Sequence, residues 1–367
     1  MDRPFLTIKE AADLAKDLFG VHVDLTSNEN VKEFECYDDR NFYINGSKDG
    51  KSEEYLLKIY GSCFSEDLVH AIIKVMLFVH DAGIVCPVPL KSMNGDYVVP
   101  KILPQTPKPN EAKKAKLEIK NVISCFVCFF TFLPGKTLKD FKVEGNSVQD
   151  QLFYEVGELT GNLCNALKDM KCTVLEKRKF HWDLYYFDSL LVGTNLLSAS
   201  EKALVNTVKS TFKTQIKPKL AVLPKQCIHG DINDGNILVE KLPHKFTLSG
   251  IIDFGDVNYT CRVFEIAIAA GYMTTVSEND PIKAAAYTVA GFNSKCPLTQ
   301  DESDLILYCI QARLCQSRCF GAHTIKLFPE NANYLLHHSL NALEILKSIM
   351  NVTKEEFDKM WRNICKE

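Results

Sequence analysis

The sequence predicts an α+β fold with two lobes: a small β-rich N-terminal lobe over residues 1–133 and a larger, mainly helical C-terminal lobe over residues 134–367. Three observations lead to this prediction. Short strand-like segments alternate with turns in the first third of the chain, and helical periodicity dominates the rest. Between them, Leu133-Pro134-Gly135-Lys136 has the proline and glycine expected of a hinge. With 367 residues, 46% of them hydrophobic, the chain is long enough for two lobes around a cleft.

The N-terminal lobe is expected to begin with a helix over residues 7–19, where apolar side chains recur on one face and Gly20 follows as a stop signal. A second helix is expected over residues 66–82. The expected strands are Phe42–Ile44, Tyr55–Tyr60, Asp96–Val99 and Val122–Leu133, with a turn at Ser47–Gly50. Pro104–Lys120, with five lysines and three prolines, is interpreted as a solvated hairpin loop rather than a binding patch.

The net charge and the cysteine content of the chain argue against several classes of protein, namely nucleic-acid-binding, membrane-binding and disulfide-rich secreted proteins. A formal net charge of -3 gives no field that would recruit nucleic acid or an anionic membrane, so neither is expected as a partner. The fourteen cysteines are scattered behind a charged N-terminus, which indicates reduced thiols in a cytoplasmic protein. Cys125 and Cys128 have the gap of a zinc knuckle. On a strand, however, residues three apart face opposite sides, and no second ligand pair follows, so core packing is favoured over a metal site.

The C-terminal lobe contains two strand-like segments, Ile237–Glu240 and Thr247–Ile252, beside a polar motif. His229-Gly230-Asp231 precedes Asn236 by a short loop, and Asp253-Phe254-Gly255-Asp256 follows the second segment. Phosphoryl transfer needs a carboxylate to accept the hydroxyl proton and separate oxygen ligands for Mg²⁺. Because a loop and a hairpin strand can bring such oxygens together, the pattern indicates a phosphoryl-transfer site.

These segments resemble the aminoglycoside phosphotransferase and choline kinase superfamily, and the resemblance implies a bilobal protein-kinase-like fold. It also implies that Asp231 is the catalytic base, that Asn236 and Asp253 are Mg²⁺ ligands, and that His229 braces the catalytic loop rather than reacting. Protein kinases have Arg where this chain has Gly230, and a long activation segment after the Asp-Phe-Gly. Here a helix is expected to start soon after that motif, so the acceptor is expected to be a small molecule.

The same resemblance assigns nucleotide-binding residues in the N-terminal lobe. Lys58 stands in the strand whose lysine binds phosphates, although a strand lysine that points to solvent would give the same pattern. Tyr37–Phe42 occupies the place of the phosphate-covering loop but has no glycine, so Asn41 is expected to contribute through its side chain. The helix glutamate that pairs with this lysine in the family is missing. Either Glu66, in the first turn of the helix, takes that role or Lys58 is held without it.

Within the superfamily the chain resembles the hydroxylysine kinases, through Phe132–Gly135, Asn233–Leu238, Val263–Ala267, Ala312–Ser317 and Leu327–Asn331 in addition to the motifs above. This resemblance implies 5-hydroxy-L-lysine as acceptor, with GTP or ATP as donor. Two alternatives remain. One is another small-alcohol kinase, of the choline, homoserine or aminoglycoside type. The other is a non-catalytic binding module, suggested by the missing glutamate and the glycine-free loop.

A hydroxylated amino acid carries a carboxylate and ammonium groups, so its pocket needs a cationic and an acidic end. Arg313 and Arg318 lie in the apolar helical stretch 305–320, where either could face the carboxylate, although a structural ion pair explains each as well. Asp256 directly follows the Asp-Phe-Gly motif and is the expected ammonium ligand. Glu265 is a second candidate for that role.

Overall fold

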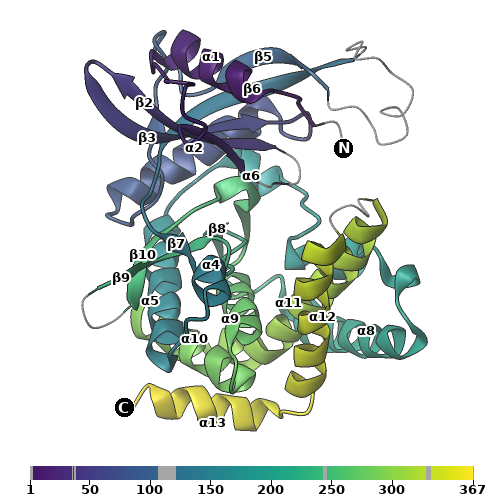
Figure 1. Cartoon of the computed structure of the whole chain (residues 1–367). Helices are drawn as coiled ribbons and strands as arrows, with labels where there is room; N and C mark the ends of the chain where they lie inside the picture. The colour runs from purple at the N-terminus through teal and green to yellow at the C-terminus, as the bar shows by residue number, and fades with distance from the viewer. Residues whose placement is uncertain are drawn as a thin grey trace. The chain divides into compact units, whose positions relative to one another are not determined.

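The structure, a computed structural model, describes residues 3–34, 36, 39–105, 121–242, 246–327 and 332–366 (Figure 1). The chain divides into two compact units, one formed by Met1–Asp81 and Cys86–Pro134 and the other by Ala82–Val85 and Gly135–Glu367. The break after Pro134 falls within the segment with hinge composition. The first unit is built on an antiparallel sheet and the second is mainly helical, which confirms the predicted α+β class.

A six-stranded antiparallel sheet, with β2, β3 and β6 side by side, forms the first unit (Figure 1). Its strands are β1 (Val31–Phe34), β2 (Arg40–Lys48), β3 (Lys51–Tyr60), β4 (Pro89–Leu90), β5 (Val99–Pro104) and β6 (Val122–Thr131). Positive φ angles of 53° at Asp49 and 79° at Gly50 close the β2–β3 hairpin, as the predicted turn requires. The strand expected at Asp96–Val99 instead begins at Val99, because backbone bonds between Ser92 and Asp96 form a turn.

Helix α1 (Ile8–Phe19) lies against this sheet and confirms the predicted opening helix. Thr7 caps it through a capping box with Glu10, and Gly20 ends it with a φ of 71°. Its apolar face enters the core of the unit, where the Phe19 and Phe129 rings stack with centroids 4.6 Å apart. The second predicted helix is present as α2 (Glu66–Asp81).

Cys125 and Cys128 on β6 are buried free thiols within the first unit. No group of three or more His, Cys, Asp or Glu side chains able to hold a metal ion occurs among the described residues. Most of the lysine-rich segment, residues 106–120, lies outside the described residues.

Two small sheets and a set of helices form the second unit. One sheet joins β7 (Lys136–Thr137), β9 (Ile237–Lys241) and β10 (Phe246–Ile251), and the other joins β8 (Lys225–Ile228) and β11 (Asn258–Cys261). The helices are α4 (Leu138–Val143), α5 (Asp150–Leu167), α6 (Thr173–Lys177), α7 (Phe187–Leu190), α8 (Ala199–Thr211), α9 (Val263–Val276), α10 (Pro281–Lys295), α11 (Gln300–Leu327), α12 (Ala332–Ile349) and α13 (Lys354–Ile364). Across the described ranges, no helix is long and apolar enough to cross a membrane.

Helix α9 is apolar almost all round and packs against α5, α10 and α11 (Figure 1). Helices α5 and α10 cross very closely, because Gly157 and Gly291 leave room for the backbone of the opposite helix. A Cβ atom at either glycine would stand 2.0 Å from a carbonyl oxygen, of Thr288 or of Tyr154 respectively. Helices α5, α9, α10 and α11 therefore form a closely packed group within the second unit.

Candidate active site

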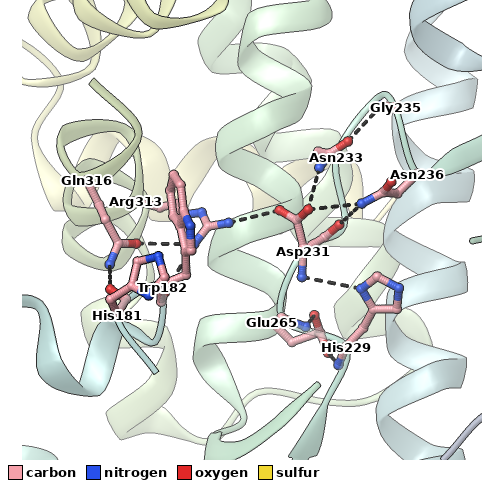
Figure 2. A network of polar contacts seen from close by, with 11 residues as sticks. His181, Trp182, His229, Asp231, Asn233, Gly235, Asn236, Glu265, Arg313 and Gln316 are labelled. Carbon is pink, nitrogen blue, oxygen red and sulfur yellow. Dashed lines mark hydrogen bonds and ion pairs between the residues drawn. The ribbon is translucent and has the colours of Figure 1, made fainter. Parts of the chain in front are cut away.

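The loop between β8 and β9 is held by a buried carboxylate. Glu265, in the first turn of α9 and fully buried, accepts hydrogen bonds from the backbone N–H groups of His229 and Gly230, the latter at 3.0 Å (Figure 2). Gly230 has a φ of 83°, and a Cβ atom there would meet the Asp256 carbonyl oxygen at 2.8 Å. The sequence at this turn therefore needs glycine, and the loop is fixed to the core by α9.

Asp231 is the central side chain of the loop, and its carboxylate receives three hydrogen bonds (Figure 2). Oδ2 accepts from the side-chain amides of Asn233 at 2.8 Å and Asn236 at 3.0 Å, while Oδ1 accepts from Arg313 at 3.0 Å. About 24% of the side chain is exposed, so the carboxylate is accessible from solvent. The carboxylate is thus oriented by three donors without being closed off.

Arg313 reaches Asp231 from α11 and is itself almost completely buried. Its guanidinium donates to the Trp182 carbonyl oxygen and to Gln316 Oε1, both at 3.2 Å, and Gln316 donates onward to the His181 carbonyl oxygen at 3.1 Å (Figure 2). The guanidinium carbon lies 4.7 Å from the ring centroid of Trp182 and 5.3 Å from that of Tyr272. Arg313 is therefore held rigidly between aromatic rings.

Asn236 and Asp253 are brought together by the β9–β10 hairpin. The Ile252 N–H donates to the Asn236 carbonyl oxygen at 2.9 Å, so Asp253 follows directly after a residue bound to Asn236. The Asn236 side-chain nitrogen donates to Asp231, so the amide oxygen of Asn236 points away from Asp231. Asp253 has a φ of 62°, a conformation that costs a non-glycine residue about 1–3 kcal/mol and is concentrated at functional sites.

His229 is a neutral structural group in this loop. Complete burial lowers its pKa to about 4, although the charge of Asp253 opposes that shift. The ring Nε2 lies 3.1 Å from the Ile252 carbonyl oxygen, and Nδ1 accepts from the Asp231 N–H at 3.3 Å. The ring therefore links the β8–β9 loop to the end of β10 and carries no charge near neutral pH.

Asp256 adds a third carboxylate beside Asp231 and Asp253. Burial, together with the charge of Asp231, raises its pKa to about 8, although Arg178 lowers it in part. Burial raises the pKa of Asp231 as well, opposed mainly by Arg313. This concentration of carboxylates needs compensating positive charge, which Arg313 and Arg178 supply from within the protein and a metal ion or a substrate ammonium group could supplement.

Two residues predicted to bind substrate have structural partners. Glu265 binds the backbone of the β8–β9 loop, as described above. Arg318 pairs with Glu201 of α8, with 2.7 Å between Arg318 Nη2 and Glu201 Oε1, and both side chains are about 12% exposed. The sequence offered a signal for the role of Glu265, because it is the only acidic residue in an otherwise apolar helix.

In the first unit, Lys58 on β3 pairs with Asp39, with Nζ and Oδ2 2.7 Å apart and both side chains largely buried. Asn41 lies directly opposite Lys58 in the β2–β3 register. Glu66, the alternative partner considered for Lys58, is more than half exposed, with its Oε1 4.0 Å from His70 Nε2. Tyr37 and Asp38 of the expected phosphate-covering loop lie outside the described residues. Sequence reasoning missed Asp39.

An aromatic pocket of about 330 Å³ opens on the sheet of the first unit and was not predicted. Phe34, Tyr43 and Phe132 form its aromatic side, where the Phe34 and Phe132 rings are nearly parallel, at 3°, with centroids 6.2 Å apart. Polar and charged residues form the rest of its lining: Glu29, Asn30, Lys32 and Asn45. Tyr43 stands two positions from Asn41 on β2, so it projects from the same sheet face as Asn41 and Lys58. A flat apolar group bound in this pocket would therefore share a sheet face with Lys58.

An antiparallel sheet in the first unit and a mainly helical second unit are the arrangement of the protein-kinase-like fold. The sequence profile of the phosphotransferase enzyme family, APH, matches residues 31–298. This match covers more than half of the chain, which therefore belongs to that family.

Two curated relatives and two solved structures illustrate what the chain is similar to. The hydroxylysine kinases of Xenopus laevis and Mus musculus are each 28% identical, over 375 and 383 residues; the alignments cover 98% and 99% of this chain and 94% of each relative. The microcompartment-associated aminopropanol kinase superposes with a TM-score of 0.63 at 15% identity, covering 94% of this chain and 98% of that one. Amicoumacin kinase hAmiN, in complex with AMP-PNP, Ca²⁺ and Ami, superposes with a TM-score of 0.62 at 14% identity. That superposition covers 96% of this chain and 94% of the amicoumacin kinase chain. These superpositions show the shared fold.

Proposed function

We propose that this protein transfers the γ-phosphate of GTP or ATP to the hydroxyl group of 5-hydroxy-L-lysine. The observation that carries the chemistry is the carboxylate of Asp231, which is oriented by three donors and remains partly exposed. In this reaction the acceptor hydroxyl gives its proton to Asp231 and its oxygen bonds to the γ-phosphorus. The bond from that phosphorus to the β-phosphate oxygen breaks, and the nucleoside diphosphate leaves.

Asn236 and Asp253 are the proposed ligands of Mg²⁺. Their donor set, one amide oxygen and one carboxylate, fits a hard cation that takes oxygen ligands and keeps part of its coordination for phosphates and water. The Asn236 amide nitrogen already binds Asp231, which leaves its oxygen for this role. When bound, Mg²⁺ would neutralise charge on the transferred phosphate.

Lys58 is the proposed phosphate ligand of the first unit, and the aromatic pocket is the proposed site of the purine base. A purine is flat, and stacking on aromatic side chains contributes about 1–3 kcal/mol per base in other proteins. The shared sheet face of Tyr43 and Lys58 supports this arrangement, since base and phosphates belong to one ligand. The ion pair with Asp39 supports a Lys58 that is positioned without a helix glutamate.

The acceptor is inferred from the full-length similarity to hydroxylysine kinases and from charge. Hydroxylysine carries an ammonium group on the carbon next to its hydroxyl carbon, so that group comes close to the base. Asp256 lies within the electrostatic influence of Asp231 and is the proposed partner of this ammonium. Binding a cation there offsets the mutual repulsion of the carboxylates.

A phosphorylation screen tests the proposal. The purified protein is incubated with Mg²⁺ and ATP or GTP, and with 5-hydroxylysine, lysine, homoserine, choline or ethanolamine, and the products are identified by mass spectrometry. We expect phosphorylation of 5-hydroxylysine, and a turnover reduced by about 10²–10⁴-fold in Asp231→Asn with little change in nucleotide affinity. Efficient phosphorylation of choline or homoserine, without turnover of 5-hydroxylysine, would show that the proposed acceptor is wrong. No transfer and no nucleotide hydrolysis would identify a binding module.

A further inference from the structure

Asp231 has one hydrogen-bonding position left, and it lies on the oxygen that Arg313 binds. A carboxylate oxygen offers about two lone-pair sites. Among the described residues, the two asparagine amides fill those of Oδ2, whereas Oδ1 receives a single bond, from Arg313. An acceptor hydroxyl that donates to Asp231 therefore finds its site on Oδ1, beside the guanidinium.

Arg313 could affect this site in two ways: by binding a carboxylate of the acceptor or by fixing Oδ1 itself. The geometry favours the second. The Arg313 side chain is about 2% exposed, so an acceptor has almost no surface of it to contact. Both Nη1 contacts are to protein oxygens, and the two aromatic rings restrict movement towards an added ligand.

We infer that Arg313 is a positioning residue, which sets the orientation of the Asp231 carboxylate and leaves Oδ1 as the proton-accepting atom. This inference rests on the proposed role of Asp231 as base. Gln316 and Trp182 anchor the guanidinium, so the ion pair transmits the fixed geometry of α11 to the catalytic loop. Displacing a reacting group by about 1 Å can lower a rate by about 10²-fold. Loss of Arg313 should therefore lower kcat for every acceptor alike.

The test compares two acceptors, 5-hydroxylysine and 1-amino-2-propanol. Both have a hydroxyl group on the carbon next to an aminomethyl group, but only hydroxylysine has a carboxylate. For Arg313→Met we expect kcat to fall by about 10–100-fold with both acceptors, with each KM changed by less than about threefold. Arg313→Lys should retain more activity than Arg313→Met, because it restores the positive charge. Added guanidinium should partly restore Arg313→Ala.

Arg362 provides the matched control. Its guanidinium also lies over a tryptophan ring, 4.4 Å from the Trp361 centroid, and donates a hydrogen bond to Ser303, but it belongs to α13. Arg362→Met should leave kcat unchanged. Circular dichroism of each variant separates a rate effect from loss of fold, and rescue by guanidinium decides the role of Arg313 if Arg313→Met is unstable.

Four results would overturn the inference. A KM for hydroxylysine that rises alone, while 1-amino-2-propanol is unaffected, would make Arg313 a carboxylate receptor. A normal kcat in Arg313→Met would show that Arg313 does not position Asp231. An equal loss of kcat in Arg313→Lys and Arg313→Met, without rescue of Arg313→Ala by guanidinium, would show that Arg313 supports only the fold. If the parent protein phosphorylates neither acceptor, the proposed function fails and this inference fails with it. An active parent with unaffected Arg313 variants refutes only the inference.

Discussion

Asp39 and Lys58 form a buried ion pair that connects the residue directly before β2 to the last part of β3, with 2.7 Å between Oδ2 and Nζ. Removing one partner leaves the other charge buried, which costs about 3 kcal/mol or more in other proteins. We expect Asp39→Ala to lower the free energy of unfolding by about that amount and to raise KM for the nucleotide. Denaturant unfolding and initial-rate kinetics measure the two effects.

Glu66→Gln is the control for this pair. Because Glu66 is more than half exposed, its substitution should change the free energy of unfolding by less than about 0.5 kcal/mol and leave the nucleotide KM unchanged. The opposite ranking, with Glu66→Gln more damaging than Asp39→Ala, would return the pairing role to the helix.

Asp253 is a proposed metal ligand and also has a strained backbone conformation. Two substitutions separate these properties. Asp253→Ala and Asp253→Gly both remove the carboxylate, so both should lose Mg²⁺-dependent nucleotide binding in calorimetry. Glycine accepts a φ of 62° without strain, so Asp253→Gly should unfold at a higher temperature than Asp253→Ala. Tight Mg-nucleotide binding by either variant would contradict the metal assignment.

Asp183 should make stability depend on pH in the acidic range. Burial raises its pKa to about 6, even though the Tyr185 N–H and the Thr260 hydroxyl donate to the carboxylate. The folded state therefore binds the proton more tightly than the unfolded state, whose pKa is 3.8. This group contributes stability that is fully present below about pH 4 and is lost as pH rises through about 6.

Asp183→Asn removes that titration and can keep both hydrogen bonds on Oδ1. We expect this variant to be more stable than the parent at pH 8 by on the order of 1–3 kcal/mol, with the difference shrinking towards pH 4. Urea unfolding at pH 4, 5, 6 and 8 measures it. A parent protein that gains stability over Asp183→Asn as pH rises from 5 to 8 would contradict the assignment.

The α5–α10 crossing should tolerate no side chain at Gly291. In Gly291→Ala the added methyl group would meet the Tyr154 carbonyl oxygen at 2.0 Å, so the helices must separate, at a cost of about 1–3 kcal/mol or more. Gly271 in α9 is the matched helical control, because a Cβ atom there meets its nearest neighbour at an ordinary 3.8 Å. Thermal unfolding should rank Gly271→Ala at or above the parent and Gly291→Ala well below it.

The sequence predicted the parts of the fold and site that depend on local pattern. Helix α1 has its cap, apolar face and terminal glycine within a few residues, and the spacing of Asp231, Asn236 and Asp253 is set by a loop and one hairpin. Contacts between distant segments could not be read in this way. The Arg313 pair with Asp231 joins residues 82 positions apart, so periodicity identified the arginine as unusual but not its partner.

Asp39 was overlooked for a different reason. The family pattern directed attention to the helix for a partner of Lys58, whereas the partner directly precedes β2, the strand that pairs with β3. The aromatic pocket was also missed, because Phe132 is distant in sequence from Phe34 and Tyr43 and only the pairing of β1, β2, β3 and β6 brings them together.

The hydrogen bonds between Glu265 and the β8–β9 loop have a consequence for protein engineering. Two consecutive N–H groups of the loop have their acceptor on a helix that begins more than thirty residues later in the chain. The loop therefore cannot be transferred to another protein by itself. Transplanted into a scaffold whose α9 equivalent has no acidic side chain at this point, the same His-Gly-Asp sequence would leave two buried donors unsatisfied, so the loop and the first turn of α9 must be exchanged together.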